Sequence, residues 1–238
     1  MCFLLDELFG VCYNEKGENM TKEKIIEIVK TFVYAVLAGI CISVGGAVYL
    51  ACENIIVGAI FFAVGLFTIF NFNLNLYTGK LCYVFNNNWR YSLKLVLILV
   101  GNFIGTSISA GLLRLTRFAS KMAKCQAIVD VKIADKLSSL FILAIFCGFL
   151  IYVASECFKS ENALTKYLGL FFGVSVFVIC GFEHSVADMF YFAFVGYFTG
   201  RAFLSLLVVA LGNFVGGTAF ELIKKLFKPK EKQIKFDF

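Results

Sequence analysis

Long apolar segments recur along almost the whole of this sequence, and they restrict its possible folds more than any other feature. Eight such segments cover residues 31–51, 54–70, 76–87, 95–113, 137–156, 166–181, 188–199 and 202–226. A helix that spans a lipid bilayer needs about 20 mostly apolar residues, so the segments 76–87 and 188–199 are too short to cross alone. Each of these two follows a longer segment after a short interruption. We therefore predict an all-α membrane protein with six transmembrane crossings, two of which contain a broken helix.

The composition argues against a soluble globular protein of this length. Of the 238 residues, 60% are hydrophobic and only 16% are charged. A soluble domain of this size exposes too much surface to hide so many apolar side chains, whereas a bilayer can surround them. We expect one transmembrane domain over residues 1–238, with an amphipathic surface helix over 1–20 and a basic cytoplasmic tail over 227–238. The nine cysteines show no CxxC spacing and the chain has one histidine, so no metal site is expected.

Polar residues fill both interruptions between a long and a short apolar segment. The first interruption, residues 71–75, contains three asparagines. The second, residues 181–185, contains Glu183 and His184, and Asp188 follows closely. Irregular polar backbone at membrane depth is tolerated only where it is buried in protein or lines a cavity, and ionisable side chains there usually serve a function. We therefore expect both interruptions to face the protein interior or a pathway through it.

A repeated motif relates the two halves of the chain. Gly101-Asn102-Phe103-Ile104-Gly105 recurs as Gly212-Asn213-Phe214-Val215-Gly216, an offset of 111 in the numbering. The same offset places the first interruption on residues 182–186, which overlap the second. Each half then holds three crossings, an odd number, so the halves run through the membrane in opposite directions. We predict two inverted three-helix repeats with a substrate site where the broken helices meet. The glycines also permit close helix packing, which is the simpler explanation of the motif.

The distribution of lysine and arginine predicts cytoplasmic termini. With both ends inside, the inner segments carry 14 of these residues and the outer segments carry seven. Cytoplasmic loops usually hold the excess of positive charge, which favours this orientation in the cell membrane. The segment 114–136, which we expect to be an outer loop, is an exception because it contains six basic residues. These residues either attract anions to the outer mouth or anchor the loop at lipid headgroups.

His184 is the only histidine in the sequence. Without a second histidine or clustered thiols it is a poor metal ligand, but it can exchange a proton or donate a hydrogen bond to a passing solute. Thr78 opens the short helix after the first interruption, where its hydroxyl either caps backbone amides or bonds a solute or His184. Helix N-termini at the two breaks would favour an anion. Lys80 either adds positive potential there or pairs with an acidic neighbour.

The nine residues from Gly181 to Met189, GFEHSVADM, resemble the signature of the formate/nitrite transporter family, whose usual form is GFEHSxANM. Leu76-Tyr77-Thr78-Gly79 is similar to the family's segment after its first break, and the start of the first span and both GNFxG motifs also fit. The resemblance covers residues from about 20 to 226. It implies an aquaporin-like protomer, a homopentamer, and one pore through each protomer for a small monovalent anion such as formate, nitrite or hydrosulfide.

The resemblance also implies which residues form the pore. His184 would be the central polar group, hydrogen-bonded to Thr78 between two apolar constrictions. The cytoplasmic constriction would consist of Phe62, Leu66 and Phe177, and the outer constriction of Leu76, Tyr77 and Ile151. Taken without the family, each of these apolar residues would be read as ordinary packing or lipid contact.

Three positions depart from the family pattern. Asp188 replaces an asparagine, Tyr77 replaces a phenylalanine, and Gly148 stands where an asparagine is common. We expect these departures to affect the choice of anion more than the fold. Passage is either passive, helped by a hydrogen bond from the histidine, or linked to protonation of the anion.

Two other functions compete with anion transport. A neutral-solute channel of the aquaporin type would have Asn-Pro-Ala at both breaks, but the only proline, Pro229, lies in the basic tail. An intramembrane enzyme would need a nucleophile and a base, but the sequence has no G-x-S-x-G or H-E-x-x-H motif and a single histidine. We therefore predict a membrane transporter rather than an enzyme, with neither a cofactor nor a nucleic-acid partner.

Overall fold

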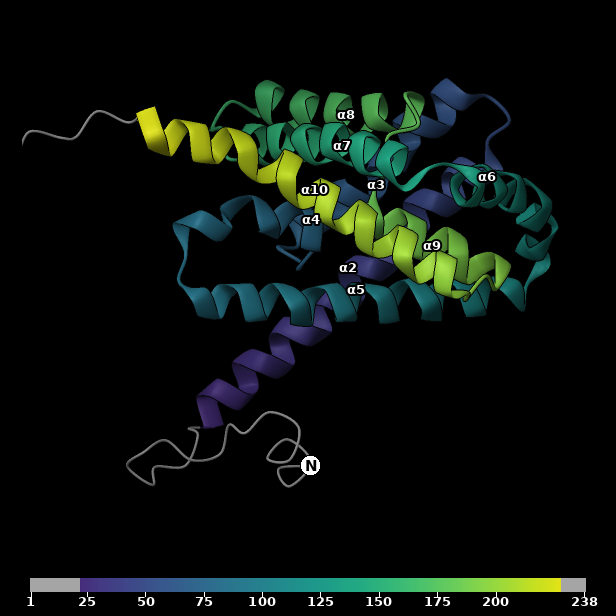
Figure 1. Ribbon diagram of the computed structural model, residues 1–238, viewed down its shortest axis with the longest axis horizontal. Coiled ribbons are helices and arrows are strands. Elements are labelled where there is room, and N and C mark those ends of the chain that lie inside the picture. The colour runs from purple at the N-terminus through teal and green to yellow at the C-terminus, as the bar shows by residue number, and fades with distance from the viewer. Residues whose placement is uncertain (1–21, 228–238) are drawn as a thin grey trace, which may run out of the picture.

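The computed structural model describes residues 22–227, and all regular structure in that range is helical (Figure 1). In chain order the elements are α2 (Lys22–Ala51), α3 (Ile55–Asn71), α4 (Tyr77–Lys80), η1 (Leu81–Asn86), α5 (Trp89–Arg114), η2 (Arg117–Lys121), α6 (Met122–Ala134), α7 (Leu137–Phe158), α8 (Ala163–Ile179), α9 (Ser185–Val195) and α10 (Gly200–Phe227). The all-α prediction is confirmed. The amphipathic helix predicted over 1–20 and the tail beyond Phe227 lie outside the described residues.

The long helices have the length and the surface of membrane spans. Four of them, α2, α5, α7 and α10, are long and apolar enough to cross a membrane. Helices α3 and α8, with 17 residues each, and α9, with 11, are also apolar but shorter. Large apolar side chains lie on the outside of the bundle, among them Phe61 and Phe172, which are 58% and 63% exposed. Such a surface is unfavourable in water and favourable in lipid, so the chain is a multi-pass membrane protein.

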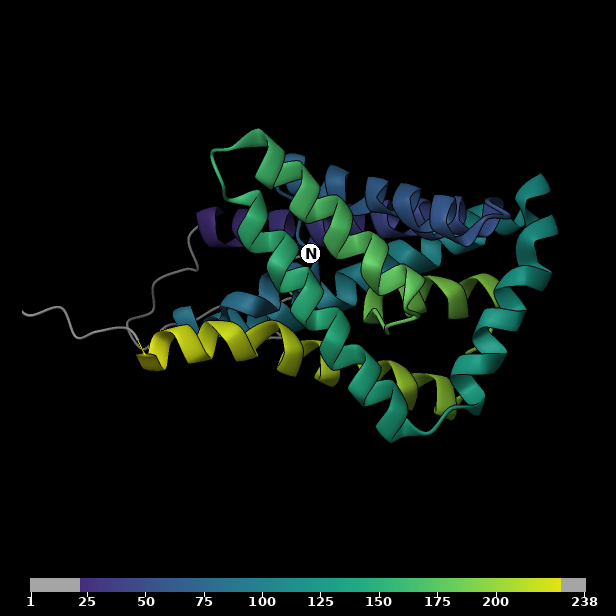
Figure 2. The ribbon, with the colours of Figure 1, turned by 90° about the horizontal axis from the view of Figure 1, so that it is seen from above.

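The long helices run along a common direction and define two ends of the bundle (Figure 1, Figure 2). We call one end the terminal face, because α2 begins and α10 ends there. At the other end, the opposite face, α2 and α5 end and α10 begins. The short helices leave the interior in different directions: η1 leads to the terminal face, whereas α9 leads to the opposite face.

Helices α3 and α8 end at the two polar segments singled out in the sequence, and they end in the same way. Asn73 and Gly181 have left-handed backbone, with φ of 52° and 66°. The following amides, of Leu74 and Phe182, each donate to the carbonyl oxygen five residues earlier, at 2.9 Å. This is the Schellman ending of a helix, which favours glycine or asparagine at the left-handed position.

The two interruptions correspond at an offset smaller than the predicted one. The left-handed residue of the first interruption is Asn73 and that of the second is Gly181, so the offset taken from the GNFxG motifs is too large by three positions here. The motif nevertheless occupies the same position within α5 and α10. The three extra residues therefore lie in α9 and the turn after it, residues 185–199, compared with 77–88 in the first half.

The GNFxG motifs bring two pairs of long helices into close contact. Gly105 of α5 packs on α2, where a Cβ atom would lie 2.0 Å from the carbonyl oxygen of Val36. Gly216 of α10 packs on α7, where a Cβ atom would lie 1.9 Å from the carbonyl oxygen of Ile145. Both distances are far below van der Waals contact, so only glycine fits without moving a helix. The packing role expected of the motif is confirmed.

Replacing Gly216 by alanine is expected to destabilise the protein by about 1–3 kcal/mol, because α10 and α7 must move apart to admit the methyl group. Gly111 of α5 is a matched control, since a Cβ atom there meets nothing within 4 Å. Gly111→Ala should leave stability unchanged or raise it slightly, because alanine favours the helix. Thermal unfolding of the two purified variants measures the difference. Equal melting temperatures would contradict the close contact at Gly216.

Residues 114–136 were expected to form a loop, and that prediction is wrong. Helix α6 lies across the opposite face of the bundle (Figure 2). Cys125 and Val129 of α6 are fully buried, and the Cys125 thiol lies 3.5 Å from the carbonyl oxygen of Tyr191 in α9. The many lysines of the segment obscured this short apolar pattern in the sequence.

Candidate functional site

The side chains of His184 and Thr78 meet inside the bundle. Nε2 of His184 lies 2.8 Å from Oγ1 of Thr78, and the two residues are 2% and 0% exposed. Nδ1 of His184 accepts a hydrogen bond from the amide of Ala187 at 3.1 Å, which caps α9. Since Nδ1 is an acceptor, a neutral His184 carries its hydrogen on Nε2 and donates it to the Thr78 oxygen. The hydroxyl hydrogen of Thr78 is then available to a further acceptor.

Asn213 of the second GNFxG motif holds the second interruption in place. Its Oδ1 accepts a hydrogen bond from the amide of Ser185 at 3.0 Å. Its Nδ2 donates to the carbonyl oxygens of Glu183 at 2.8 Å and Ala144 at 2.9 Å. Asn213 is fully buried, so these bonds satisfy backbone groups that water cannot reach.

Asn102 makes the same three bonds at the first interruption. Its Oδ1 accepts from the amide of Tyr77 at 2.9 Å, and its Nδ2 donates to the carbonyl oxygens of Asn75 at 2.9 Å and Ala35 at 2.7 Å. The sequence indicated that both motifs allow close helix packing, and it is their glycines that do so. It did not indicate that each asparagine fixes the backbone of a break that lies several helical turns away along the chain.

Buried apolar side chains enclose the histidine–threonine pair. The ring of Phe177 stacks on the imidazole with centroids 5.5 Å apart, and Phe62 meets Phe177 edge-on at 5.9 Å. All six residues predicted for the two constrictions are at most 8% exposed, namely Phe62, Leu66, Phe177, Leu76, Tyr77 and Ile151. The hydroxyl that Tyr77 adds donates to the carbonyl oxygen of Ala210 at 3.4 Å.

Relative to the chain termini, Phe62 and Leu76 lie on the sides opposite to those expected for their groups. Phe62 packs against Gly45, in the half of α2 that leads to the opposite face. Leu76, by contrast, lines a cavity together with Lys159, which lies at the terminal face. If the termini are cytoplasmic, Leu76 belongs to the inner group and Phe62 to the outer. The motifs identified the residues, but they did not give the direction in which each broken helix continues.

The cavity next to Leu76 has a volume of about 370 Å³ and is lined in part by two basic side chains, Lys80 and Lys159. It is lined by Ile69, Phe70, Asn73, Leu74, Leu76, Gly79, Lys80, Tyr83, Asn87, Tyr91, Ser155, Phe158 and Lys159. Among residues 22–227, no carboxylate lies within 4 Å of the Lys80 ammonium. Of the two roles considered for Lys80, a source of positive potential fits this arrangement better than an ion pair.

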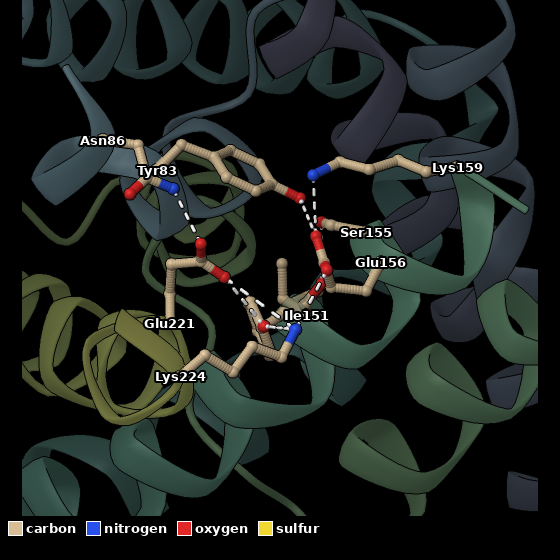
Figure 3. A network of polar contacts seen from close by, with 9 residues as sticks. Tyr83, Asn86, Ile151, Ser155, Glu156, Lys159, Glu221 and Lys224 are labelled. Carbon is tan, nitrogen blue, oxygen red and sulfur yellow. Dashed lines mark hydrogen bonds and ion pairs between the residues drawn. The ribbon is translucent and has the colours of Figure 1, made fainter. Parts of the chain in front are cut away.

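A polar network beside this cavity fastens η1 to the long helices (Figure 3). The carboxylate of Glu156 in α7 accepts a hydrogen bond from the Tyr83 hydroxyl at 3.0 Å and pairs with Lys224 of α10 at 3.1 Å. Glu221 of α10 accepts a hydrogen bond from the amide group of Asn86 at 2.7 Å. These contacts set the position of the segment that continues from Thr78 to the terminal face.

The acidic residues beside His184 are paired with a lysine that the sequence did not single out. Lys132 of α6 forms ion pairs with Glu183 and, at 3.0 Å, with Asp188. The three side chains are 13%, 6% and 4% exposed. A charged side chain in a membrane interior is usually paired with an opposite charge. The basic segment 114–136 contains the lysine that pairs with these two acidic residues. Neither role considered for that segment, attraction of anions or anchoring at headgroups, describes Lys132.

Comparison with known proteins places this site in a family. The sequence model described as formate/nitrite transporter matches residues 12–225. The chain belongs to the formate/nitrite transporter family. Membership of a transporter family confirms the prediction of a transporter rather than an enzyme.

Two curated relatives of this formate/nitrite transporter are transport proteins of bacilli. The chain is 29% identical over 183 residues to the uncharacterized transporter YrhG of Bacillus subtilis (strain 168), covering 69% of this chain and 68% of the relative. It is 30% identical over 142 residues to the formate channel BtFdhC of Bacillus thuringiensis, covering 56% of this chain and 52% of the relative.

Two solved structures share the fold of the chain. A pentameric formate channel with formate bound superposes with a TM-score of 0.71 at 21% identity, covering 84% of this chain and 97% of that one. An FNT family ion channel superposes with a TM-score of 0.70 at 19% identity, covering 86% of this chain and 90% of that one.

Proposed function

We propose that this formate/nitrite transporter conducts a small monovalent anion, of the formate, nitrite or hydrosulfide type, along a path past His184 and Thr78. The hydrogen bond between these two residues carries the proposal. It joins polar groups from both interruptions in a place otherwise enclosed by apolar side chains. The relative named a formate channel supports an anion of this size.

The hydrogen-bond pattern suggests how the pair would treat an anion. Because His184 donates to Thr78, the threonine hydroxyl can donate to an acceptor atom of the passing anion. The N-terminus of α9, which begins beside His184, adds the positive end of a helix dipole.

The apolar groups on either side of the pair would make this hydrogen bond important. A bare anion must lose water to pass Leu76 and Phe62, and desolvation of a charge is very costly. The hydrogen bond from Thr78 lowers this cost, and protonation of the anion to a neutral acid removes most of it. Both forms of passage, passive and proton-linked, use the same two residues.

We also propose that the chain forms two inverted three-helix repeats with six crossings. The equal helix endings at Asn73 and Gly181 and the equal bonds of Asn102 and Asn213 support a repeat. The departure of η1 and α9 towards different faces supports its inversion. The protein is proposed to lie in the cell membrane with both termini in the cytoplasm, and to assemble as a homopentamer, as in the solved pentameric channel.

Flux into liposomes that contain the purified protein tests the proposed function. Formate, nitrite, hydrosulfide, lactate and chloride are compared with protein-free liposomes. We expect at least one of the weak-acid anions to enter well above the protein-free rate. Chloride, which a proton does not neutralise in water, should remain near the protein-free rate if passage is proton-linked and should enter with the other anions if passage is passive. The native mass of the same preparation should equal five chains. Passage of water or glycerol without any of the anions would instead support a neutral-solute channel.

A further inference from the structure

The charged residues around Lys132 do not balance. One ammonium group, on Lys132, faces two carboxylates, on Glu183 and Asp188, and all three side chains are nearly inaccessible to solvent. Among residues 22–227, no second cation lies within 4 Å of either carboxylate. With both acids ionised the cluster would carry one net negative charge.

The other titratable groups near the cluster do not supply the missing charge. They are Cys125 on α6, Cys147 on α7, Tyr191 on α9 and Tyr49 on α2, together with His184 itself. His184 is held by its Nδ1 acceptor bond in the neutral form. From α10 the contacts are the uncharged Asn213 and Arg201, whose guanidinium bonds to the carbonyl oxygens of Ile133 and Asp135 and forms no ion pair with either carboxylate. Helix α5 brings Arg114 only to Gly196, at the far end of α9. Helix α4 contributes Thr78, which is not charged.

A buried negative charge without a partner is strongly unfavourable. Two carboxyl groups that meet in a poorly solvated place avoid this cost by holding one proton between them. Glu183 and Asp188 both contact the same ammonium nitrogen, so a proton on either acid leaves one carboxylate facing one ammonium group. An ionised pair would also oppose an anion at His184, because Glu183 is the adjacent residue and the amide of Asp188 bonds to the carbonyl oxygen of His184 at 3.0 Å.

We propose that Glu183 and Asp188 share one proton, so that these residues and Lys132 form an interior proton-binding site beside the anion path. The proton enters from water at the opposite face and converts one carboxylate to a carboxylic acid, which makes the cluster neutral. Loss of the proton returns a net negative charge next to His184. Its consequence for transport rests on the proposed function, whereas the proton-binding site itself does not.

Asp188 is the residue that creates the site. With asparagine at this position, as in the family signature, Lys132 and Glu183 would balance each other at any pH near neutrality. Asp188→Asn therefore removes the shared proton while it keeps the size of the side chain and a hydrogen-bonding group next to Lys132.

Infrared spectroscopy of the purified full-length protein tests the site without any transport. At neutral pH we expect the carbonyl stretch of a buried carboxylic acid in the wild-type protein, shifted by exchange into heavy water and absent in Asp188→Asn. Glu53→Gln is the matched control, because it removes a carboxylate whose side chain is 86% exposed, and the band should persist in it. A wild-type spectrum without a carboxylic acid band at neutral pH overturns the proposal, even if Asp188→Asn fails to fold.

The ratio of formate flux through Asp188→Asn to flux through the wild type tests the consequence for transport. The ratio cancels the titration of formate itself. It should be near one in acid, where the wild-type cluster is neutral, and should rise to about tenfold in alkali, the effect of one charge about 10 Å away at an effective dielectric constant of about 20. A ratio independent of pH overturns the link to transport. Absence of flux in the wild type, with the infrared band present, would reject the proposed function and leave the proton site standing.

Discussion

Replacement of Asn213 by leucine is expected to lower the stability of the protein by several kcal/mol. Leucine has a similar branched shape, but it leaves two buried backbone groups without partners, the amide of Ser185 and the carbonyl oxygen of Glu183. The carbonyl oxygen of Ala144 loses its second bond and keeps the one within α7. Each buried group left unsatisfied costs about 1–3 kcal/mol, and no water is at hand in the membrane interior to replace the lost bonds. Thermal and denaturant unfolding of the purified variant measure the loss.

Two further variants make this test specific. Asn102→Leu should cost a similar amount, because Asn102 makes the equivalent three bonds in the first half. Asn71→Leu is the control, since Asn71 is exposed and its side chain bonds only to the carbonyl oxygen of Phe67 in its own helix. It should change stability by less than about 1 kcal/mol. If Asn213→Leu unfolds at the same temperature as Asn71→Leu, the two asparagines do not hold the breaks.

The helices were predictable because their signals are local. Runs of apolar residues gave the spans, and the asparagine-rich and glycine-containing interruptions gave the breaks near Asn73 and Gly181. Helix α6 was not predictable in this way, because its two buried positions, Cys125 and Val129, form only a short apolar pattern within a segment that carries six basic residues. The offset taken from the GNFxG motifs did not apply at the breaks. The second half has three extra residues between its break and its motif, so the two breaks are closer in the sequence than the two motifs.

The site was predictable where its residues lie in a motif. His184 and Thr78 stood out from their positions at the two interruptions, and the six apolar residues came from the resemblance to the family. The structure brings His184 and Thr78 into contact. Lys132 was not found, because its partners Glu183 and Asp188 lie beyond two intervening helices in the sequence and the pairing depends on how α6 crosses the bundle. The sequence also did not show which apolar group lies nearer the terminal face, because that depends on the direction in which the chain continues after each break.

Replacement of His184 by phenylalanine is expected to reduce formate flux by about 100-fold or more, the range typical of removing a positioned hydrogen-bond donor from a water-excluded anion site. Phenylalanine keeps a planar ring against Phe177, but it cannot donate to Thr78 or to a solute. The assembly should stay folded, since the change removes one helix cap, worth about 0.5–2 kcal/mol. Flux into liposomes and thermal unfolding are measured on the same preparation.

Two controls separate transport from structure in this test. Thr78→Val deletes one hydrogen bond, worth about 0.5–1.5 kcal/mol, and should therefore reduce flux by roughly tenfold at most. Asn54→Ala removes a helix cap of the same kind, at the solvent- or lipid-exposed start of α3, and should leave flux unchanged. If His184 only secures the second break, flux and melting temperature should fall together in His184→Phe.

The most direct measurement is formate flux through wild-type and His184→Phe protein in liposomes across a range of pH, with both proteins shown to be folded. The proposed path past His184 predicts pH-dependent flux in the wild type and almost none in the variant. Folded His184→Phe protein that carries formate at the wild-type rate, with the wild-type dependence on pH, would contradict it.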